Sequence, residues 1–204
     1  METIECPQCG AATLPSLRIC EYCKAEYFVT SLAYLGNFND GKVAKYLNHY
    51  KNLIALEPQN EEGLFGLGLC YLQIGNYQLA EKHFGKVIDV VPEQSKAYYY
   101  YALSIIKGRR IKIISFNEAR KIENYLQTAI QLDDSVPEYK LLLAMLKIDF
   151  YEANGMKVPP PCSRELLSEI DGAEINVHEA NRLNECARIA NPEILFRNVK
   201  ITND

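Results

Sequence analysis

Long apolar stretches are missing from this 204-residue sequence, and none approaches the roughly 20 consecutive apolar residues that a membrane-spanning helix needs. The first ten residues, METIECPQCG, also lack the charged region and apolar run of a secretory signal. We therefore expect a soluble, cytoplasmic protein that makes no membrane contact. The formal net charge is only −4, so the molecule as a whole does not attract nucleic acid, and such binding would need a local basic patch.

Signatures of catalysis are missing as well, since the sequence has no phosphate-binding glycine loop, nucleophile elbow or paired-carboxylate motif. Two of its three histidines, His49 and His83, lie one repeat length apart, which favours packing or surface roles. The third, His178, shares a predicted helix with Cys186 but lies about 12 Å from it along the axis, too far for a thiolate–imidazole pair. We expect no enzymatic activity.

Tryptophan is absent, whereas tyrosine and cysteine are abundant, with 14 and seven residues. An odd number of cysteines without a secretory signal argues for metal or thiol chemistry over a disulfide framework. The hydrophobic fraction of 48% is enough for a folded core and excludes a disordered chain.

Four of the seven cysteines lie within the first 23 residues, as two Cys-x-x-Cys pairs. Two residues between paired cysteines allow a tight turn with both thiolates pointing inward, and two such turns supply four sulfurs in tetrahedral geometry. We predict that this site binds Zn²⁺, with iron in the same site and a disulfide pair as the alternatives. The predicted metal ligands are Cys6, Cys9, Cys20 and Cys23.

Residues 4–28 resemble the short bacterial zinc ribbons that begin Cys-Pro-x-Cys-Gly-Ala and end Cys-x-Tyr-Cys-Gly-Ala, with Lys24 in place of the second glycine. The stretch has too few apolar residues to order itself, so the metal must hold it together. Four thiolates fill the tetrahedron, and the resemblance therefore implies a structural ion with no position for a substrate water. Residues 2–26 hold only Arg18 and Lys24 against four glutamates, too few cations for a DNA-reading ribbon.

The middle of the chain repeats with a period of 34 residues, the length of one helix-turn-helix unit. The matched pairs are Gly41 with Gly75, His49 with His83, Tyr50 with Phe84, Ile54 with Ile88 and Pro58 with Pro92. Within residues 61–94, apolar side chains recur at helical spacing on either side of Gly75-Asn76, and Pro92 ends the second helix. Small residues at Gly68 and Ala80 are expected to let the two helices approach closely.

The order Leu64-x2-Leu67-Gly68-x2-Tyr71, then Gly75, Tyr77, Ala80-x3-Phe84 and Pro92, resembles the tetratricopeptide (TPR) repeat. The resemblance extends over about residues 32–155, with an insertion around 108–114 and a proline-rich connector at 158–161. Capping boxes are predicted at Ser115 with Glu118 and at Ser135 with Glu138. Short C-terminal helices are expected near 163–170 and 177–190.

These patterns predict a mostly α fold, a TPR-like antiparallel helix-pair solenoid with a small N-terminal zinc ribbon of short β-hairpins. The expected domains are the ribbon at 1–30, the TPR-like repeats at 31–156, and capping helices with a tail at 157–204. Departures from the consensus are expected in terminal repeats, which must present a polar outer face.

The first helix of each unit lines the concave face of such a stack, and its outward positions form a nearly continuous apolar stripe. The stripe residues are Phe65, Leu69, Leu72, Tyr99, Leu103, Ile106, Leu141, Met145 and Ile148. One interpretation is a groove for an amphipathic helix or apolar peptide of a partner. The other is that the C-terminal helix folds back and fills the stripe, because large exposed apolar patches are uncommon in monomers.

Charge is concentrated in two places. Residues 107–121 carry net charge +5, mostly from Lys107, Arg109, Arg110 and Lys112, and residues 165–193 carry −5. The blocks could pair within the molecule, pair between copies in self-association, or bind an acidic partner. A solvated loop is the alternative for the basic turn.

We therefore predict a non-catalytic adaptor or scaffold that holds a protein or peptide partner through the groove, with Zn²⁺ in the ribbon. The alternative function is a nucleic-acid-associated regulator that uses the ribbon and the basic turn at 107–121. It is disfavoured because neither stacking aromatics nor a recognised nucleic-acid fold accompanies the basic run.

Overall fold

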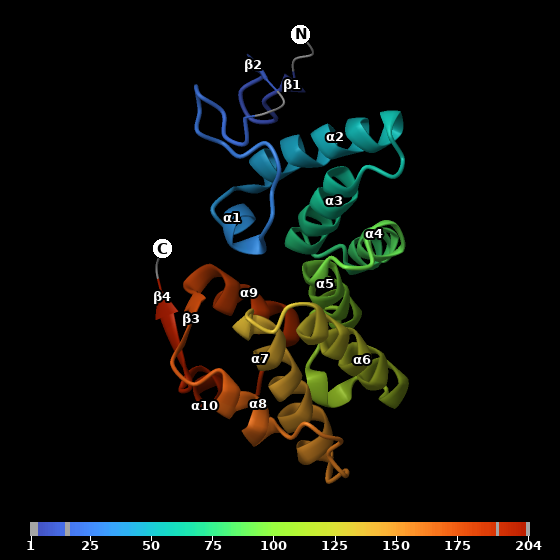
Figure 1. The fold of residues 1–204 in the computed structure, drawn as a ribbon, viewed down its shortest axis with the longest axis vertical. Helices are drawn as coiled ribbons and strands as arrows, with labels where there is room; N and C mark the ends of the chain where they lie inside the picture. The colour runs from blue at the N-terminus through green and yellow to red at the C-terminus, as the bar shows by residue number, and fades with distance from the viewer. Residues whose placement is uncertain (1–3, 15–16, 191, 203–204) are drawn as a thin grey trace.

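The computed structural model describes residues 4–14, 17–190 and 192–202 (Figure 1). A small module of turns and short strands lies at one end, and helices stack beyond it along the long axis of the molecule. The C-terminal segment does not extend this stack, because it returns and packs beside the earlier helices. Within the described residues, no helix is long and apolar enough to cross a membrane.

The N-terminal module contains strand β1 (Ile4–Glu5), paired antiparallel with β2 (Ala12–Thr13), and a second hairpin closed by an isolated bridge between Ile19 and Glu26. The chain then enters the helical stack. Its helices are α1 (Leu32–Gly36), α2 (Asp40–Leu56), α3 (Glu61–Gln73), α4 (Tyr77–Val90), α5 (Ser95–Ile106), α6 (Phe116–Leu132) and α7 (Pro137–Leu146). Each helix from α2 to α7 packs against the next, as helical hairpins do.

The helix pair α3 and α4 is the best-formed unit, and glycines set its spacing. A Cβ added at Gly68 would lie 2.6 Å from the ring of Phe84 on α4, and one added at Gly66 would lie 2.4 Å from the ring of Tyr50 on α2. Tyr50 and Phe84 are the aromatic pair that the period of 34 matches. The predicted close approach at Gly68 is therefore confirmed, and the same device recurs one helix earlier.

Replacing Gly68 by alanine should destabilise the protein by about 1–3 kcal/mol, because the added methyl group overpacks the contact with Phe84. Gly41→Ala is the matched control, since the nearest atom to its new Cβ would be 3.6 Å away and α2 is solvent-exposed there. That change should be neutral or stabilise by up to about 1 kcal/mol through helix propensity. Urea unfolding of both variants measures the difference, and equal midpoints would contradict the argument.

The insertion between α5 and α6 is a tight turn that contains the short 3₁₀ helix η1 (Ile111–Ile113). Ser115 and Glu118 form the predicted capping box at the start of α6. The box predicted at Ser135 and Glu138 is wrong: Val136 occupies the N-cap of α7, and Ser135 instead donates to Asp133 Oδ1 at 2.6 Å. Asp133 is the C-cap of α6. Ser135 therefore bonds to the turn between α6 and α7 and does not cap α7.

Helix α7 continues through a π-helical turn, η2 (Lys147–Tyr151), and a 3₁₀ turn, η3 (Glu152–Asn154), to Gly155. Gly155 adopts a positive φ of 64°, which ends the helix. The run from Pro137 to Gly155 is therefore helical as predicted, but it is not a uniform α-helix.

The C-terminal segment contains α8 (Ser163–Glu169), β3 (Ala173–Asn176), α9 (Val177–Ala187), α10 (Pro192–Phe196) and β4 (Val199–Thr202). Strands β3 and β4 pair in parallel, with Ala173 opposite Val199, and this small sheet is absent from the sequence prediction. Helix α9 ends at Ala187, three residues before the expected Ala190, where Arg188 takes a left-handed conformation.

Candidate metal centre and partner surfaces

The structure brings the four predicted ligands together, since the Sγ atoms of Cys6, Cys9, Cys20 and Cys23 all lie within 4.8 Å of one another. The sulfurs of Cys6 and Cys23 are 3.5 Å apart, and those of Cys9 and Cys20 are 3.7 Å apart. A tetrahedral zinc–thiolate site with Zn–S bonds of about 2.3 Å has sulfurs about 3.8 Å apart. The spacing therefore fits a four-coordinate metal.

Both hairpins position their cysteines with the same backbone bonds. Gly10 N–H donates to Cys6 O and Lys24 N–H donates to Cys20 O, each at 2.9 Å. Gly10 and Lys24 have positive φ values of 75° and 60°, so Lys24 occupies the left-handed region that favours glycine. The two Cys-x-x-Cys turns are thus equivalent and face each other.

The four sulfurs lie in unequal environments, and burial raises the pKa of the Cys23 thiol to about 12. A backbone N–H from Cys23 lowers the pKa of the Cys20 thiol to about 6, whereas burial raises the pKa of the Cys6 thiol. Four thiolates this close repel one another unless a positive charge lies among them. Leu14 and Ile19 are exposed, so this module has only a very small apolar core around Tyr27. These observations fit a metal that supplies the cohesion that side chains do not.

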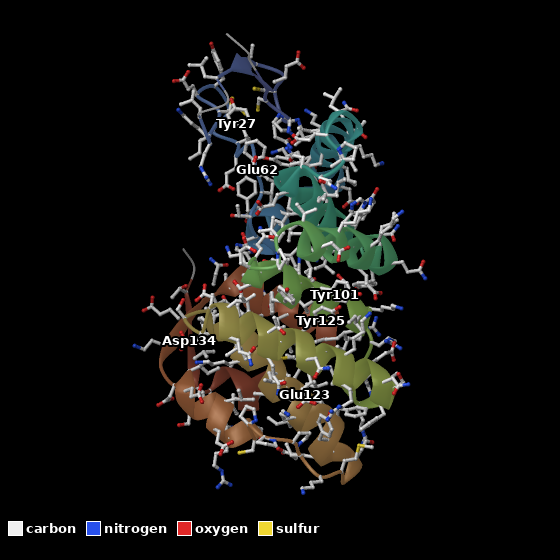
Figure 2. All side chains as sticks on the ribbon, turned by 45° about the vertical axis from the view of Figure 1, so that its right-hand side comes forward. Tyr27, Glu62, Tyr101, Glu123, Tyr125 and Asp134 are labelled. Atoms are coloured by element: carbon white, nitrogen blue, oxygen red, sulfur yellow. The ribbon has the colours of Figure 1, made fainter. Side chains whose placement is uncertain are left out.

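Tyrosine hydroxyls attach this module to the helices, a role that the sequence did not reveal. Glu26 N–H donates to Tyr34 Oη and Val29 N–H donates to Tyr50 Oη, each at 2.8 Å. Tyr46 Oη donates to Glu26 O at 2.7 Å. Figure 2 shows the neighbouring Tyr27 at the junction between the N-terminal module and the helices. The tyrosines were predicted as aromatic packing residues, and their ring contacts confirm this, but their hydroxyls also satisfy buried backbone groups.

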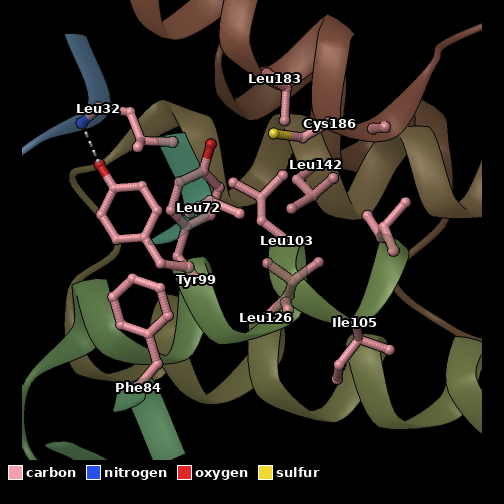
Figure 3. Packing of buried hydrophobic residues seen from close by; sticks show 14 of the residues in the cluster. Leu32, Leu72, Phe84, Tyr99, Leu103, Ile105, Leu126, Leu142, Leu183 and Cys186 are labelled. Atoms are coloured by element: carbon pink, nitrogen blue, oxygen red, sulfur yellow. Dashed lines mark hydrogen bonds between the residues drawn. The ribbon is translucent and has the colours of Figure 1, made fainter. Parts of the chain in front are cut away.

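The apolar stripe is interior packing surface. All its residues are buried except Ile148, which is half-buried. Helix α1 packs against α3, α9 against α5, and β3 with α8 against α7. Figure 3 shows Leu183 and Cys186 of α9 lying over Leu103 and Leu142. The C-terminal helix α9 covers the α5 part of the stripe, as the second interpretation expected, but α1 covers the α3 part, and α8 with β3 covers the α7 part. The predicted groove is therefore not open among the described residues. The physical reason is the one that favoured this interpretation, the cost of leaving so much apolar surface in water.

The cations of the basic turn are of two kinds: Arg109 is bonded within the fold, whereas Arg110 and Lys112 are exposed. Arg109 forms an ion pair with Glu118 at 2.7 Å and donates to the carbonyls of Ile105 and Ile106, both at 3.0 Å, at the end of α5. The Arg109 guanidinium also lowers the pKa of the Glu118 carboxyl to about 2. Arg109 therefore closes the turn instead of facing a partner.

The other predicted members of the basic patch remain accessible. Lys107 is half-buried in a left-handed conformation at the C-cap of α5, whereas Arg110 and Lys112 are exposed. Ile113 and Phe116 beside them are 68% and 53% exposed. The turn therefore presents apolar and cationic side chains together.

The acidic block at 165–193 has partners of its own. Glu169 pairs with Lys140 at 3.0 Å and Glu185 with Arg182 at 2.7 Å. Throughout the described part of the chain, no ion pair joins this block to residues 107–121. Pairing of the two blocks within one molecule is thus not seen.

Sequence comparison gives one partial relative. No protein-family model matches the chain. A stretch of 57 residues is 40% identical to the BBSome complex member BBS4 of Bos taurus, covering 28% of this chain and 11% of that protein. The chain thus spans about a tenth of the length of this relative.

Solved structures resemble the chain over more of its length. The crystal structure of MamA matches with a TM-score of 0.50 and 16% identity, covering 83% of this chain and 85% of that one. A MamA RS-1 double mutant matches with a TM-score of 0.51 and 19% identity, covering 68% and 70%. The fold is TPR-like. A mutant of Thermobaculum terrenum O-GlcNAc transferase shares it at a TM-score of 0.51 and 16% identity, covering 71% of this chain but only 29% of that enzyme.

At identities below 20%, the likeness describes the fold and carries no partner or activity over to this chain.

Proposed function

We propose that this protein is a non-catalytic adaptor that binds an acidic segment of another protein through the turn after α5. The observation that carries the proposal is the exposure of Ile113 and Phe116 next to Arg110 and Lys112. Apolar side chains rimmed by charges of one sign are typical of interaction surfaces, where the apolar part contributes affinity and the charges select the partner.

The turn is held firmly enough to act as a preformed surface. Ile111 and Ile114 are buried beneath it, and Asn154 in η3 donates to Lys112 O at 3.2 Å. The Arg109–Glu118 pair closes its base. A partner would therefore meet a backbone that is already held in place, which reduces the entropy cost of binding.

We also propose that the four N-terminal cysteines bind Zn²⁺ as a structural ion. Support comes from the sulfur spacing, the two equivalent turns and the very small core of the module. With four thiolate ligands the ion would order residues 4–28 and would leave no position for a substrate. The ion would also fix the backbone of residues 26–29, which the hydroxyls of α1 and α2 contact.

Reversing the free cations tests the adaptor. Arg110→Glu with Lys112→Glu should weaken capture of the acidic partner at least tenfold, because both charges then repel it. Lys51→Glu with Lys86→Glu is the control, since both lysines are exposed and the charge change is equal. Quantitative pull-down after nuclease treatment, with unmodified protein in parallel, measures the effect. Proteins lost with both double variants would contradict the proposed surface, and capture abolished by nuclease would favour the nucleic-acid alternative.

A further inference from the structure

A cavity of about 480 Å³ lies where the first turns of α1, α5, α7 and α9 meet. It is distinct from the metal centre and from the basic turn. The residues that give it chemical character are Lys96, Tyr99, Tyr100, Glu138, Tyr139 and Glu179. We propose that this cavity binds a cationic nitrogen group, an ammonium or guanidinium carried by a small amine or by a basic side chain of a peptide. This site is independent of the adaptor function proposed above.

Two carboxylates dominate the charge of the cavity. Glu179 is 9% exposed, and its Oε1 accepts from Ala33 N–H at 3.1 Å and from Tyr100 Oη at 3.3 Å. Glu138 is half-buried on the facing first turn of α7. Burial raises the pKa of both carboxyls, and the Glu179 carboxylate further raises the pKa of Glu138, whereas the charge of Lys96 lowers both. Lys96 is exposed and forms no ion pair with either of them among the described residues. A cation placed between the two acids would relieve their repulsion.

The walls of the cavity are aromatic. The ring centroid of Tyr99 lies 5.0 Å from that of Tyr100 and 5.2 Å from that of Tyr139. Tyr99 is 3% exposed, and its hydroxyl has no hydrogen-bond partner in the described structure. Buried hydroxyls are normally paired, and a ligand N–H that reached this oxygen would supply its missing partner. Tyrosine faces also attract ammonium and guanidinium groups.

An anion fits this cavity less well, although helix N-termini surround it. At the N-termini of α1 and α9, Tyr34 N–H already donates to Ser31 Oγ at 3.3 Å and His178 N–H to Asn176 Oδ1 at 2.8 Å. Pro137 at the first turn of α7 has no N–H to offer. An anion would therefore meet two carboxylates with Lys96 as the facing cation. The volume is within the range of small-ligand pockets and admits one side chain or a small amine.

Titration calorimetry with agmatine, a small molecule with one ammonium and one guanidinium, tests the site on the full-length protein. Glu138→Gln should weaken agmatine binding at least tenfold, because it removes one negative charge and keeps the side-chain shape. Glu93→Gln is the matched control, an exposed glutamate just before α5, and should bind as the unmodified protein does. Tyr99→Phe should weaken binding about threefold to tenfold, since only the unpaired hydroxyl is lost.

A short peptide with one lysine and blocked ends forms the second arm. Binding of agmatine and peptide would identify a site open to a partner's side chain, and binding of agmatine alone would identify a small-amine site; both support the proposal. Sodium acetate is the anion probe. The proposal is overturned if agmatine does not bind at millimolar concentration, if Glu138→Gln binds it as well as Glu93→Gln does, or if acetate binds in preference. Circular dichroism melting checks that each variant is folded.

Discussion

Removing the proposed metal with a strong chelator should unfold residues 4–28 while α3 to α7 stay folded. The reason is the small core of the N-terminal module: among its described residues, only Ala25 and Tyr27 join two cysteines in its own buried cluster. In comparable four-ligand modules, the free energy of metal binding is on the order of 10 kcal/mol, and the module folds only when the metal is bound. The helical units have an extensive core of their own and should keep their structure.

Hydrogen exchange with mass spectrometry measures this result. The amides of Cys6 and Cys20, which donate to Ala11 O at 2.9 Å and Ala25 O at 2.8 Å, should lose protection on chelation, and amides within α3 should keep it. Cys9→Ser should reproduce the loss without a chelator. Cys162→Ser is the control, because this cysteine occupies the N-cap of α8, where serine is favourable.

Elemental analysis decides between the metals. We expect about one zinc per chain. One iron per chain would indicate iron in the same site. The disulfide alternative would be indicated if the protein holds no metal and the denatured chain has fewer than its seven thiols free. If α2 loses protection together with the module, the tyrosine hydroxyls couple the two parts, because Tyr46 and Tyr50 on α2 bond to backbone groups that the metal would order.

The parts predicted correctly are those whose determinants are local. Each Cys-x-x-Cys turn places its own sulfurs, so only the meeting of two turns had to be inferred. The helix pair at 61–90 was predicted because Gly68, Gly75 and Phe84 fix spacing, turn and packing within one period. Such patterns are present in the sequence without knowledge of the rest of the fold.

The C-terminal return depends on contacts between distant residues, which the sequence pattern does not encode. The prolines at 159–161 indicate an extended connector but not its direction. The pairing of Ala173 with Val199 and the contact of Glu179 with Ala33 join residues far apart along the chain. For this reason the sequence left the covering of the apolar stripe open between two interpretations.

The buried ion pair of Lys147 was also missed. A single lysine in an apolar helix reads as a surface residue, yet Lys147 is fully buried and forms an ion pair with Glu123 on α6. Figure 2 labels Glu123 among the helices of the lower half of the molecule. Tyr151 Oη donates to Glu123 Oε2 at 2.8 Å, and Lys147 Nζ donates to Pro159 O at 2.8 Å.

Lys147→Met should destabilise the protein by about 3–5 kcal/mol, because it leaves the Glu123 carboxylate buried without a counter-charge. Lys147→Met combined with Glu123→Gln should recover at least half of that loss, since no buried charge remains and Tyr151 keeps an acceptor. Lys140→Met is the control: its partner Glu169 has a side chain that is 53% exposed, so the cost should stay below about 1 kcal/mol. Urea unfolding of the three variants and the unmodified protein gives the comparison.

The same lysine should also control whether the apolar stripe stays covered. Through Pro159 O it holds the start of the connector that leads into α8, β3 and α9, the segment that covers α5 and α7. Lys147→Met should therefore loosen the C-terminal segment before the helical stack unfolds, and binding of a hydrophobic dye should rise at urea concentrations below the main transition. If Lys147→Met costs no more than Lys140→Met, the buried pair does not stabilise the fold. If dye binding rises only with the main transition, the pair stabilises the stack without holding the segment that covers the stripe.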